Sequence, residues 1–155
     1  MSQARVEVTT TIPASPEIVY GVLKDYHHQH GQILPKEYFS DLQIDQGGQG
    51  AGTVFRVKLR VMGREFTYHM AVTEPVPGRM LVETDQNSGT VTTFTVTPTA
   101  DVRQSQVQIA TEWEAKPGVA GAIERLMTGY FMRRIYRQEL DQLASFVQQK
   151  QGQGR

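Results

Sequence analysis

The chain has 155 residues, no cysteine, and sixteen basic side chains balanced by sixteen acidic ones. This length and a hydrophobic fraction of 39% are typical of one globular domain with its own core. The zero net charge argues against binding of nucleic acid through phosphate neutralisation, and the lack of cysteine excludes disulfides, thiol nucleophiles and cysteine-ligated metals. No apolar run approaches the roughly 20 residues that cross a bilayer, and no secretion signal stands at the N-terminus. We therefore expect a cytoplasmic protein without stable membrane insertion.

The N-terminal segment predicts one strand followed by helix. Residues 6–12 alternate β-branched and polar side chains, which is typical of a strand. Ser15 is a favourable N-cap and Pro16 suits the first helical turn, so a helix is expected to begin there. Gly31 and Pro35 are expected to end it. Residues 36–40 are expected to add a short second turn.

Six further strands are predicted in the middle of the chain, where alternating segments are separated by breaks rich in glycine or proline. Residues 53–62 form the clearest of these strands. The turns at residues 63–64 and 87–89 have hairpin length, so the sheet should be antiparallel. The glycine-rich segment 47–52 lacks a Gly-Lys-Ser/Thr ending and lies between strands, so it is interpreted as a turn or bulge and not as a phosphate-binding loop.

The last element is predicted to be one long helix over residues 119–149. Its apolar residues recur at spacings of three and four, while charged residues such as Glu124, Arg133 and Glu139 fall largely on the other side. Residues 1–150 are expected to form a single domain, and residues 151–155 a disordered tail.

This order of elements comes with four recognisable segments. They are the sequence Ile-Pro-Ala-Ser-Pro-Glu-Ile-Val-Tyr at 12–20, Gly-Gln-Gly-Ala-Gly-Thr at 48–53, Val-Thr-Glu-Pro-Val-Pro-Gly-Arg at 72–79, and the terminal helix. Over about residues 4–149 the chain resembles the START-like (SRPBCC) superfamily, and most of all its bacterial polyketide cyclase/dehydrase-like branch. The resemblance implies an α+β helix-grip fold. In it, a curved seven-stranded antiparallel sheet wraps around a long C-terminal helix, in the order strand, two helices, six strands, helix.

A curved sheet of this kind has one concave apolar face, and a single helix about 10 Å across cannot fill it. Either large side chains plug the remaining space, or it forms a ligand cavity, typically of about 300–1,000 Å³. The residues expected to face this space alternate along the strands or lie on the inner stripe of the helix. As a ligand-binding set they are Phe55, Leu59, Tyr68, Met70, Thr84, Phe94, Thr111, Trp113, Ile123, Met127, Tyr130 and Arg134.

Hydroxyl groups single out a few members of this set. Tyr68, Thr111 and Tyr130 would need partners if buried, and a ligand or water could supply them. Arg134 is a possible cation for the polar end of a ligand. Trp113 is expected near the mouth of the cavity, although packing against the first helix would also fit.

Two functions fit this cavity. The first is a carrier or sensor of a hydrophobic small molecule such as a lipid, an aromatic compound or a polyketide. The second is an enzyme of cyclase or dehydratase type acting on such a ligand. The inward rows are expected to contain no carboxylate and the interior to be almost uncharged, which favours binding. A third option is an interaction module that uses the basic residues of the terminal helix, among them Arg125 and Arg137.

The histidines are not expected to bind a metal. His27, His28 and His30 lie close together, but no acidic residue is well placed to complete a site, so a solvated helix end is favoured. In an alternative interpretation, His30 lies at the cavity rim as a hydrogen-bonding or acid–base group. His69 should face outward if Tyr68 faces inward. No cofactor is implied, and the oligomeric state is left open.

Overall fold

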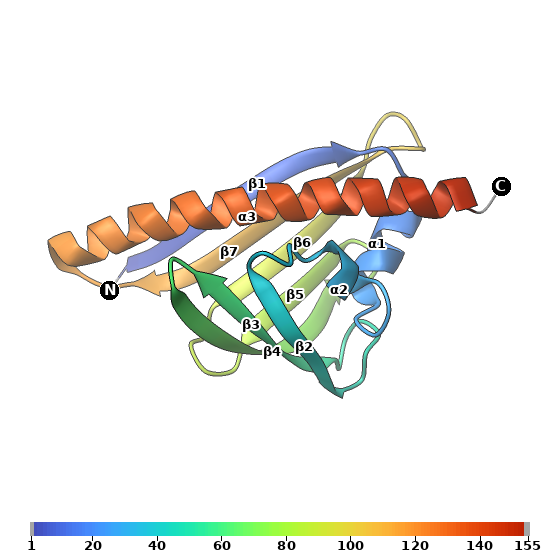
Figure 1. Ribbon diagram of the computed structural model, residues 1–155. Coiled ribbons are helices and arrows are strands. Elements are labelled where there is room, and N and C mark those ends of the chain that lie inside the picture. Colours follow the sequence, from blue (N-terminus) through green and yellow to red (C-terminus); the bar gives the residue numbers. More distant parts are fainter. Residues whose placement is uncertain (1, 154–155) are drawn as a thin grey trace.

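The computed structural model describes residues 2–153, and its elements follow the predicted order of strand, two helices, six strands and a long helix (Figure 1). In chain order they are β1 (Ser2–Ile12), α1 (Pro16–Lys24), α2 (His30–Ile33), β2 (Phe39–Gln46), β3 (Val54–Val61), β4 (Arg64–Val76), β5 (Met80–Asp85), β6 (Val91–Pro98), β7 (Ser105–Ala115) and α3 (Gly118–Gln153).

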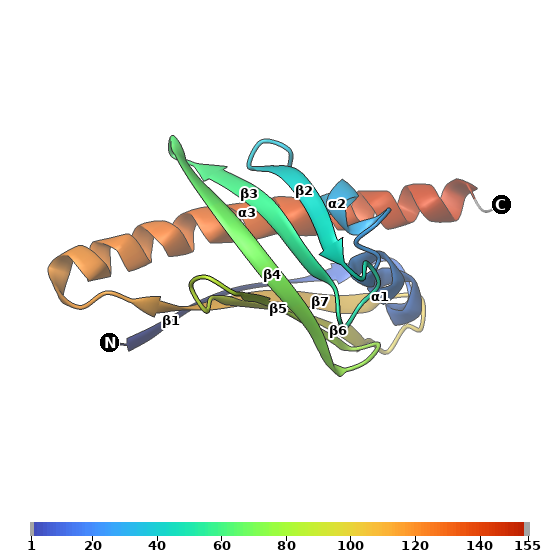
Figure 2. The same ribbon diagram turned by 90° about the horizontal axis from the view of Figure 1, so that it is seen from below.

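The seven strands form one antiparallel sheet in the order β1-β7-β6-β5-β4-β3-β2. Strands β2 to β7 are sequential neighbours, as the hairpin-length turns predict, and β1 pairs with β7. Strands β2–β4 turn away from β1 and β7, so that the bent sheet curls around α3 (Figures 1 and 2). The predicted α+β helix-grip architecture is confirmed.

The two short helices lie at one end of the sheet (Figure 1). Helix α1 begins where the sequence predicts, with the Ser15 hydroxyl accepting a hydrogen bond from the backbone of Ile18 at 3.5 Å, but it ends earlier, at Lys24. The second helix is α2. Residues 36–38 form a turn before β2, as predicted, whereas the second helix lies earlier, at His30–Ile33. Between the two helices, the backbone carbonyl of Asp25 accepts hydrogen bonds from the backbone N–H groups of Gln29 at 3.1 Å and of His30 at 2.8 Å.

The glycine-rich segment 47–52 forms turns between β2 and β3, as predicted, and packs against the residues that follow α1. The backbone of Tyr26 donates to the carbonyl of Gly48 at 2.9 Å. Gly48 has a φ of 133°, a conformation that favours glycine, and a Cβ atom there would lie 2.0 Å from the ring of His27.

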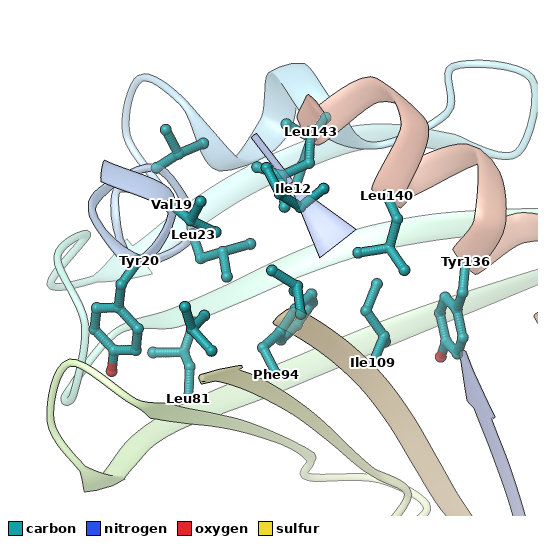
Figure 3. Close-up of a cluster of buried hydrophobic side chains, with 14 of the residues drawn as sticks. Ile12, Val19, Tyr20, Leu23, Leu81, Phe94, Ile109, Tyr136, Leu140 and Leu143 are labelled. Atoms are coloured by element: carbon teal, nitrogen blue, oxygen red, sulfur yellow. The ribbon is translucent and has the colours of Figure 1, made fainter. Parts of the chain in front are cut away.

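The hydrophobic core lies between the sheet, α1 and the C-terminal half of α3 (Figure 3). Leu140 and Leu143 point from α3 toward the sheet, where Phe94 and Ile109 meet them, and Leu23 of α1 closes one side. All five side chains are at most 2% exposed. This half of the helix is therefore part of the core.

The N-terminal half of α3 is different, because its apolar residues are exposed. The residues that the sequence groups into one inner stripe are 42–79% exposed: Val119, Ile123, Leu126, Met127 and Tyr130. At the C-terminal end, the helix continues to Gln153, three residues into the segment expected to be a tail, and residues 154–155 lie outside the described residues.

A tight turn connects β7 to α3. Gly118 has a φ of 83°, a left-handed conformation that favours glycine. A Cβ atom on Gly121 would lie 1.9 Å from the carbonyl oxygen of Lys116, so the first helical turn packs directly on the end of the strand segment. The direction in which α3 leaves the sheet is set by this contact.

Strand β5 faces the opposite way from the prediction, which places Thr84 in the inward row. In the structure Leu81 pairs with Phe94 and Glu83 pairs with Thr92. Directly opposed residues of antiparallel strands share a face, so Leu81 and Glu83 point inward with those partners. Thr84 therefore points to the other face, and the predicted inward position of Thr84 is wrong.

Candidate functional site

Two adjoining cavities lie between the sheet and α3. The larger, which we name the outer groove, has a volume of about 460 Å³ and lies between the N-terminal half of α3 and strands β3, β4 and β7. It is lined by Leu59, Val61, Met62, Arg64, Phe66, Tyr68, Thr90, Thr111, Trp113, Ala120, Ile123, Glu124, Met127, Thr128, Phe131 and Met132.

The smaller cavity, the inner chamber, has a volume of about 60 Å³ and lies deeper, between the sheet, α2 and the middle of α3. It is lined by His30, Leu34, Phe39, Phe55, Val57, Leu59, Tyr68, Met70, Glu83, Thr90, Thr92, Phe94, Thr111, Met132, Tyr136 and Glu139. Five residues line both cavities, so the groove adjoins the chamber: Leu59, Tyr68, Thr90, Thr111 and Met132.

The outer groove is mainly apolar, with Phe66 of β4 facing Ile123 and Met127 of α3 across it. Phe66 is 41% exposed, which is high for a phenylalanine. The charged side chains in its lining are Arg64 and Glu124. An open apolar groove with few charges is suited to a hydrophobic ligand.

The inner chamber is polar at its deep end, where His30 lies beside Glu83. The Nδ1 atom of His30 lies 2.6 Å from the carbonyl oxygen of Leu23, and because a carbonyl only accepts, Nδ1 carries the hydrogen. The Nε2 atom lies 3.7 Å from a carboxylate oxygen of Glu83. Burial lowers the pKa of His30 to about 4, so at neutral pH the ring is uncharged and Nε2 is an acceptor.

Glu83 titrates near neutral pH. Its side chain is buried, and burial raises its pKa to about 7, although the hydrogen bond from Tyr26 acts in the opposite direction. The Tyr26 hydroxyl donates that bond to Glu83 over 2.7 Å. The ring of Tyr26 stacks on His30 with centroids 4.5 Å apart, which fixes the positions of all three groups.

Glu139 of α3 is the second carboxyl group in the chamber. It is 2% exposed, and burial, followed by the charge of Glu83, raises its pKa well above the ordinary value. Among the described residues, no hydrogen bond acts to lower the pKa of this carboxyl group, which lines the chamber. Two buried carboxyl groups therefore share a chamber whose histidine is neutral.

Three hydroxyl groups connect the chamber to the groove. Thr92 and Thr111 are hydrogen-bonded at 2.8 Å across β6 and β7, and Thr111 is also bonded to the Tyr136 hydroxyl. Burial raises the pKa of Tyr136, so this phenol stays neutral. Thr111 belongs to both cavities, so the chain of hydroxyl groups reaches the boundary between them.

The other buried acidic residues have local structural roles. Asp85 accepts hydrogen bonds from the backbone of His69 at 2.9 Å and from the Ser88 hydroxyl at 2.7 Å. Burial alone would raise the pKa of Asp85, but these hydrogen bonds hold it below its ordinary value. Asp25 is bonded in the same way, by Gln29 and Gln49. Their oxygens stabilise turns and not the cavity.

The structure brings most of the predicted site residues together. Those that line the inner chamber are Phe55, Leu59, Tyr68, Met70, Phe94 and Thr111, and those found only in the outer groove are Trp113, Ile123 and Met127. Trp113 thus lies toward the mouth, one of its two expected positions. Whether these residues bind a ligand stays a prediction.

Tyr130 and Arg134 do not reach either cavity, so their predicted inward positions are wrong. They line a shallow surface hollow on α3, and the nearby phenols of Tyr130 and Tyr38 raise the pKa of Arg134. The reason is the helical phase: Tyr136 and Glu139 face the sheet, and positions 130 and 134 lie on another side of the helix.

The expectation of an uncharged interior without carboxylates is also wrong. Sequence reasoning missed Glu83 because β5 was assigned the wrong face, and it placed Glu139 on the outer side of the helix. A usable signal was present for both. Glu83 pairs with Thr92 of the predicted inward row, and Glu139 lies four residues after Ile135 and four before Leu143.

The histidines have separate positions. His27 and His28 are exposed, whereas His30 is 2% exposed and lines the inner chamber, so a solvated position is wrong for His30. Within residues 2–153, no three His, Asp or Glu side chains are grouped as metal ligands. His69 points outward, as predicted, with Nε2 3.7 Å from the Asp45 carboxylate. No helix in the same residues is long and apolar enough for a membrane crossing.

Solved structures with this architecture include proteins of several activities. The KanY protein is 33% identical over 96% of this chain and 99% of its own, with a TM-score of 0.83. The ZhuI aromatase/cyclase from Streptomyces sp. R1128 is 19% identical, with 96% of both chains covered and a TM-score of 0.76. Norcoclaurine synthase from Thalictrum flavum is 18% identical, with 97% of both chains covered and a TM-score of 0.71. The latter two share the fold.

Among curated proteins, no sequence matches this chain. The sequence does match the family described as polyketide cyclase / dehydrase and lipid transport, over residues 3–148. That match spans nearly the whole chain, including both cavities. The chain therefore belongs to the polyketide cyclase/dehydrase and lipid transport family.

Proposed function

We propose that this protein is a carrier or sensor that binds a hydrophobic small molecule, such as a lipid, an aromatic compound or a polyketide-like compound. The apolar body of the ligand would lie in the outer groove and a polar end would reach the inner chamber. The observation that carries the proposal is the pair of adjoining cavities, one apolar and open, the other polar and deep.

Physical considerations support this division. Removing apolar surface from water stabilises a complex by about 25 cal/mol per Å². The groove volume of about 460 Å³ lies within the range of about 300–1,000 Å³ that is usual for small-molecule sites. The side chains Ile123, Met127 and Phe66 are partly exposed to solvent, and a ligand between them would cover them.

A matched pair of α3 variants tests the proposal. Ile123 lines the groove, whereas Val119, one helical turn earlier, is 79% exposed and lies outside the groove. We expect Ile123→Glu to weaken binding of an apolar probe such as octan-1-ol about tenfold or more, because the ligand would have to desolvate a carboxylate. Val119→Glu should leave the affinity unchanged. Fluorescence of Trp113, the sole tryptophan, reports occupancy from inside the groove.

Native mass spectrometry of the protein purified from its own host would then identify the ligand class. A co-purifying lipid or aromatic compound that the Ile123→Glu variant lacks would support the proposal. Equal probe affinity in the two variants would contradict it.

A second candidate function, an enzyme of cyclase or dehydratase type, is favoured by Glu83. A carboxyl group with a pKa of about 7 that lines a substrate-sized site suits general acid–base catalysis at neutral pH. The distinguishing measurement is the mass of the ligand after incubation with the protein. Loss of water in the presence of the wild type, but not of Glu83→Gln, would favour the enzyme, and an unchanged ligand would favour the carrier.

A further inference from the structure

The deep end of the inner chamber is rich in hydrogen-bond acceptors. Glu83 and Glu139 present carboxyl groups, and the neutral ring of His30 presents the lone pair of Nε2, because Nδ1 donates to Leu23. Among the described residues that line the chamber, none is lysine or arginine. The chamber therefore contains two carboxyl groups that can ionise and no basic side chain that would pair with them.

The side chain of Glu139 is buried and lines this chamber. Its side chain is 2% exposed, and the pKa of its carboxyl group is raised by burial and by the charge of Glu83, with no hydrogen bond from residues 2–153 acting to lower it. Asp25 and Asp85, which are also buried, each accept several hydrogen bonds from turns. A buried carboxyl group that lines a cavity and lacks such donors is suited to receive them from a ligand.

We propose that the inner chamber binds the protonated amino group of an otherwise apolar ligand, held between Glu83 and Glu139. This inference rests on the proposed function, because the apolar part of the same molecule would lie in the outer groove. An ammonium group donates hydrogen bonds and accepts none, which is the complement of three acceptors. The chamber volume of about 60 Å³ exceeds what one water needs and accommodates so small a group.

Other polar end groups fit less well. A carboxylate would bring a further negative charge next to Glu83 and Glu139 without a cation to offset it. An alcohol can donate only one hydrogen bond and brings no charge. The order of affinity for ligands of one chain length should therefore be amine, then alcohol, then carboxylate.

The affinity for the amine should also depend on pH. The titratable groups around Glu83 are Tyr26 after α1, His30 of α2, Glu139 of α3, and the phenols of Tyr68 and Tyr136. In the range around neutral pH His30 and the phenols are uncharged, since burial lowers the pKa of His30 and raises those of the tyrosines. In this range ionisation of Glu83 therefore controls binding, and the amine should bind more tightly as the pH rises through about 7.

The experiment compares octylamine, octan-1-ol and octanoate by isothermal titration calorimetry with the full chain. We expect octylamine to bind the wild type about tenfold or more tightly than octan-1-ol at about pH 8, and octanoate to bind most weakly. Glu139→Gln should reduce the affinity for octylamine to about that for octan-1-ol. Asp141→Asn makes the same chemical change on an exposed position of α3 and should preserve the preference.

A measurement on the wild type alone keeps the test decisive even if a variant fails to fold. Octylamine binding should release protons, seen as a dependence of the heat on buffer ionisation enthalpy, and octan-1-ol binding should not. Two results would overturn the amine assignment while the carrier proposal stands. The first is equal affinity of the wild type for octylamine and octan-1-ol. The second is a preference for octylamine that persists in both Glu83→Gln and Glu139→Gln. If none of the three compounds binds, both proposals are overturned.

Discussion

The two halves of α3 differ in what their apolar side chains contact. In the C-terminal half, Leu140 and Leu143 are at most 1% exposed and pack against the sheet and α1. In the N-terminal half, Ile123 and Leu126 are 54% and 74% exposed. Helices are stabilised in proteins mainly by packing of this kind. One half of the helix therefore maintains the fold, while the other half forms the wall of the outer groove.

The boundary between the two halves coincides with the boundary between the cavities. Met132 lines both the outer groove and the inner chamber, and Tyr136 and Glu139, one turn and two turns later, line only the chamber. Residues that stabilise the fold and residues that line the groove therefore lie on different turns of one helix. Substitutions can change the stability or the ligand affinity separately.

The largest expected effect comes from the buried half. Leu143→Ala should lower the free energy of unfolding by about 2–5 kcal/mol, because it removes a fully buried side chain and leaves a cavity. Urea denaturation followed by far-UV circular dichroism measures the change. A loss below about 1 kcal/mol would show that the core does not depend on this half of α3.

A somewhat smaller and pH-dependent effect is expected at the boundary, from Glu83. In the unfolded chain this carboxyl group has a pKa near 4.5, and in the folded protein about 7. Its contribution to stability is therefore present below pH 4.5 and is lost as the pH rises through about 7. Glutamine cannot ionise, so Glu83→Gln avoids the cost of a buried charge. The variant should be more stable than the wild type by about 3 kcal/mol at about pH 8, and little different at low pH.

Urea denaturation over a pH series checks this expectation, and His30 provides an internal reference. The pKa of His30 is lowered from 6.5 to about 4, so its contribution is present above pH 6.5 and is lost as the pH falls through about 4. In the wild type, between about pH 4 and pH 7, the stability lost from Glu83 as the pH rises is offset by the stability gained from His30. In Glu83→Gln only the contribution of His30 remains, so the free energy of unfolding should fall as the pH is lowered through about 4. Asp141→Asn should give the wild-type profile. Parallel profiles for all three proteins would contradict the assignment of Glu83.

The smallest effect is expected from the exposed half. Leu126→Ala should change the free energy of unfolding by less than about 0.5 kcal/mol, because the side chain is 74% exposed. The affinity for octan-1-ol should also stay the same, since Leu126 does not line the groove. A destabilisation comparable to that of Leu143→Ala would mean that another surface covers this half of the helix in solution, which analytical ultracentrifugation would detect.

Much of the fold could be predicted because it depends on repeating local patterns. The alternation of Phe55, Val57 and Leu59 and the short turns determine both the inner face of β3 and the antiparallel pairing. Likewise, Ser15 and Pro16 mark the start of α1. Features of this kind need only neighbouring residues in the chain, and the sequence displays them directly.

The polar half of the site was harder to predict because it depends on partners that are distant in the sequence. Hydrophobicity alone favours Val82 over Glu83 as the inward residue of β5, yet the pairing of Glu83 with Thr92 decides its face. The helix presents the same difficulty. An apolar stripe through Tyr130 looks continuous with the stripe through Leu140, but the sheet covers only the second of them. Burial of a carboxyl group is determined by what packs on it, and not by its own chemistry.

The turn before α3 has a consequence for how members of this family could diverge. Because Gly121 packs against Lys116 without space for a Cβ atom, the outer groove takes its width from the angle at which the helix leaves the strand. A larger residue at position 121 would change the direction of the N-terminal half of α3, while the C-terminal half stayed packed against the sheet. Ligand size could thus change through a single residue that no ligand touches.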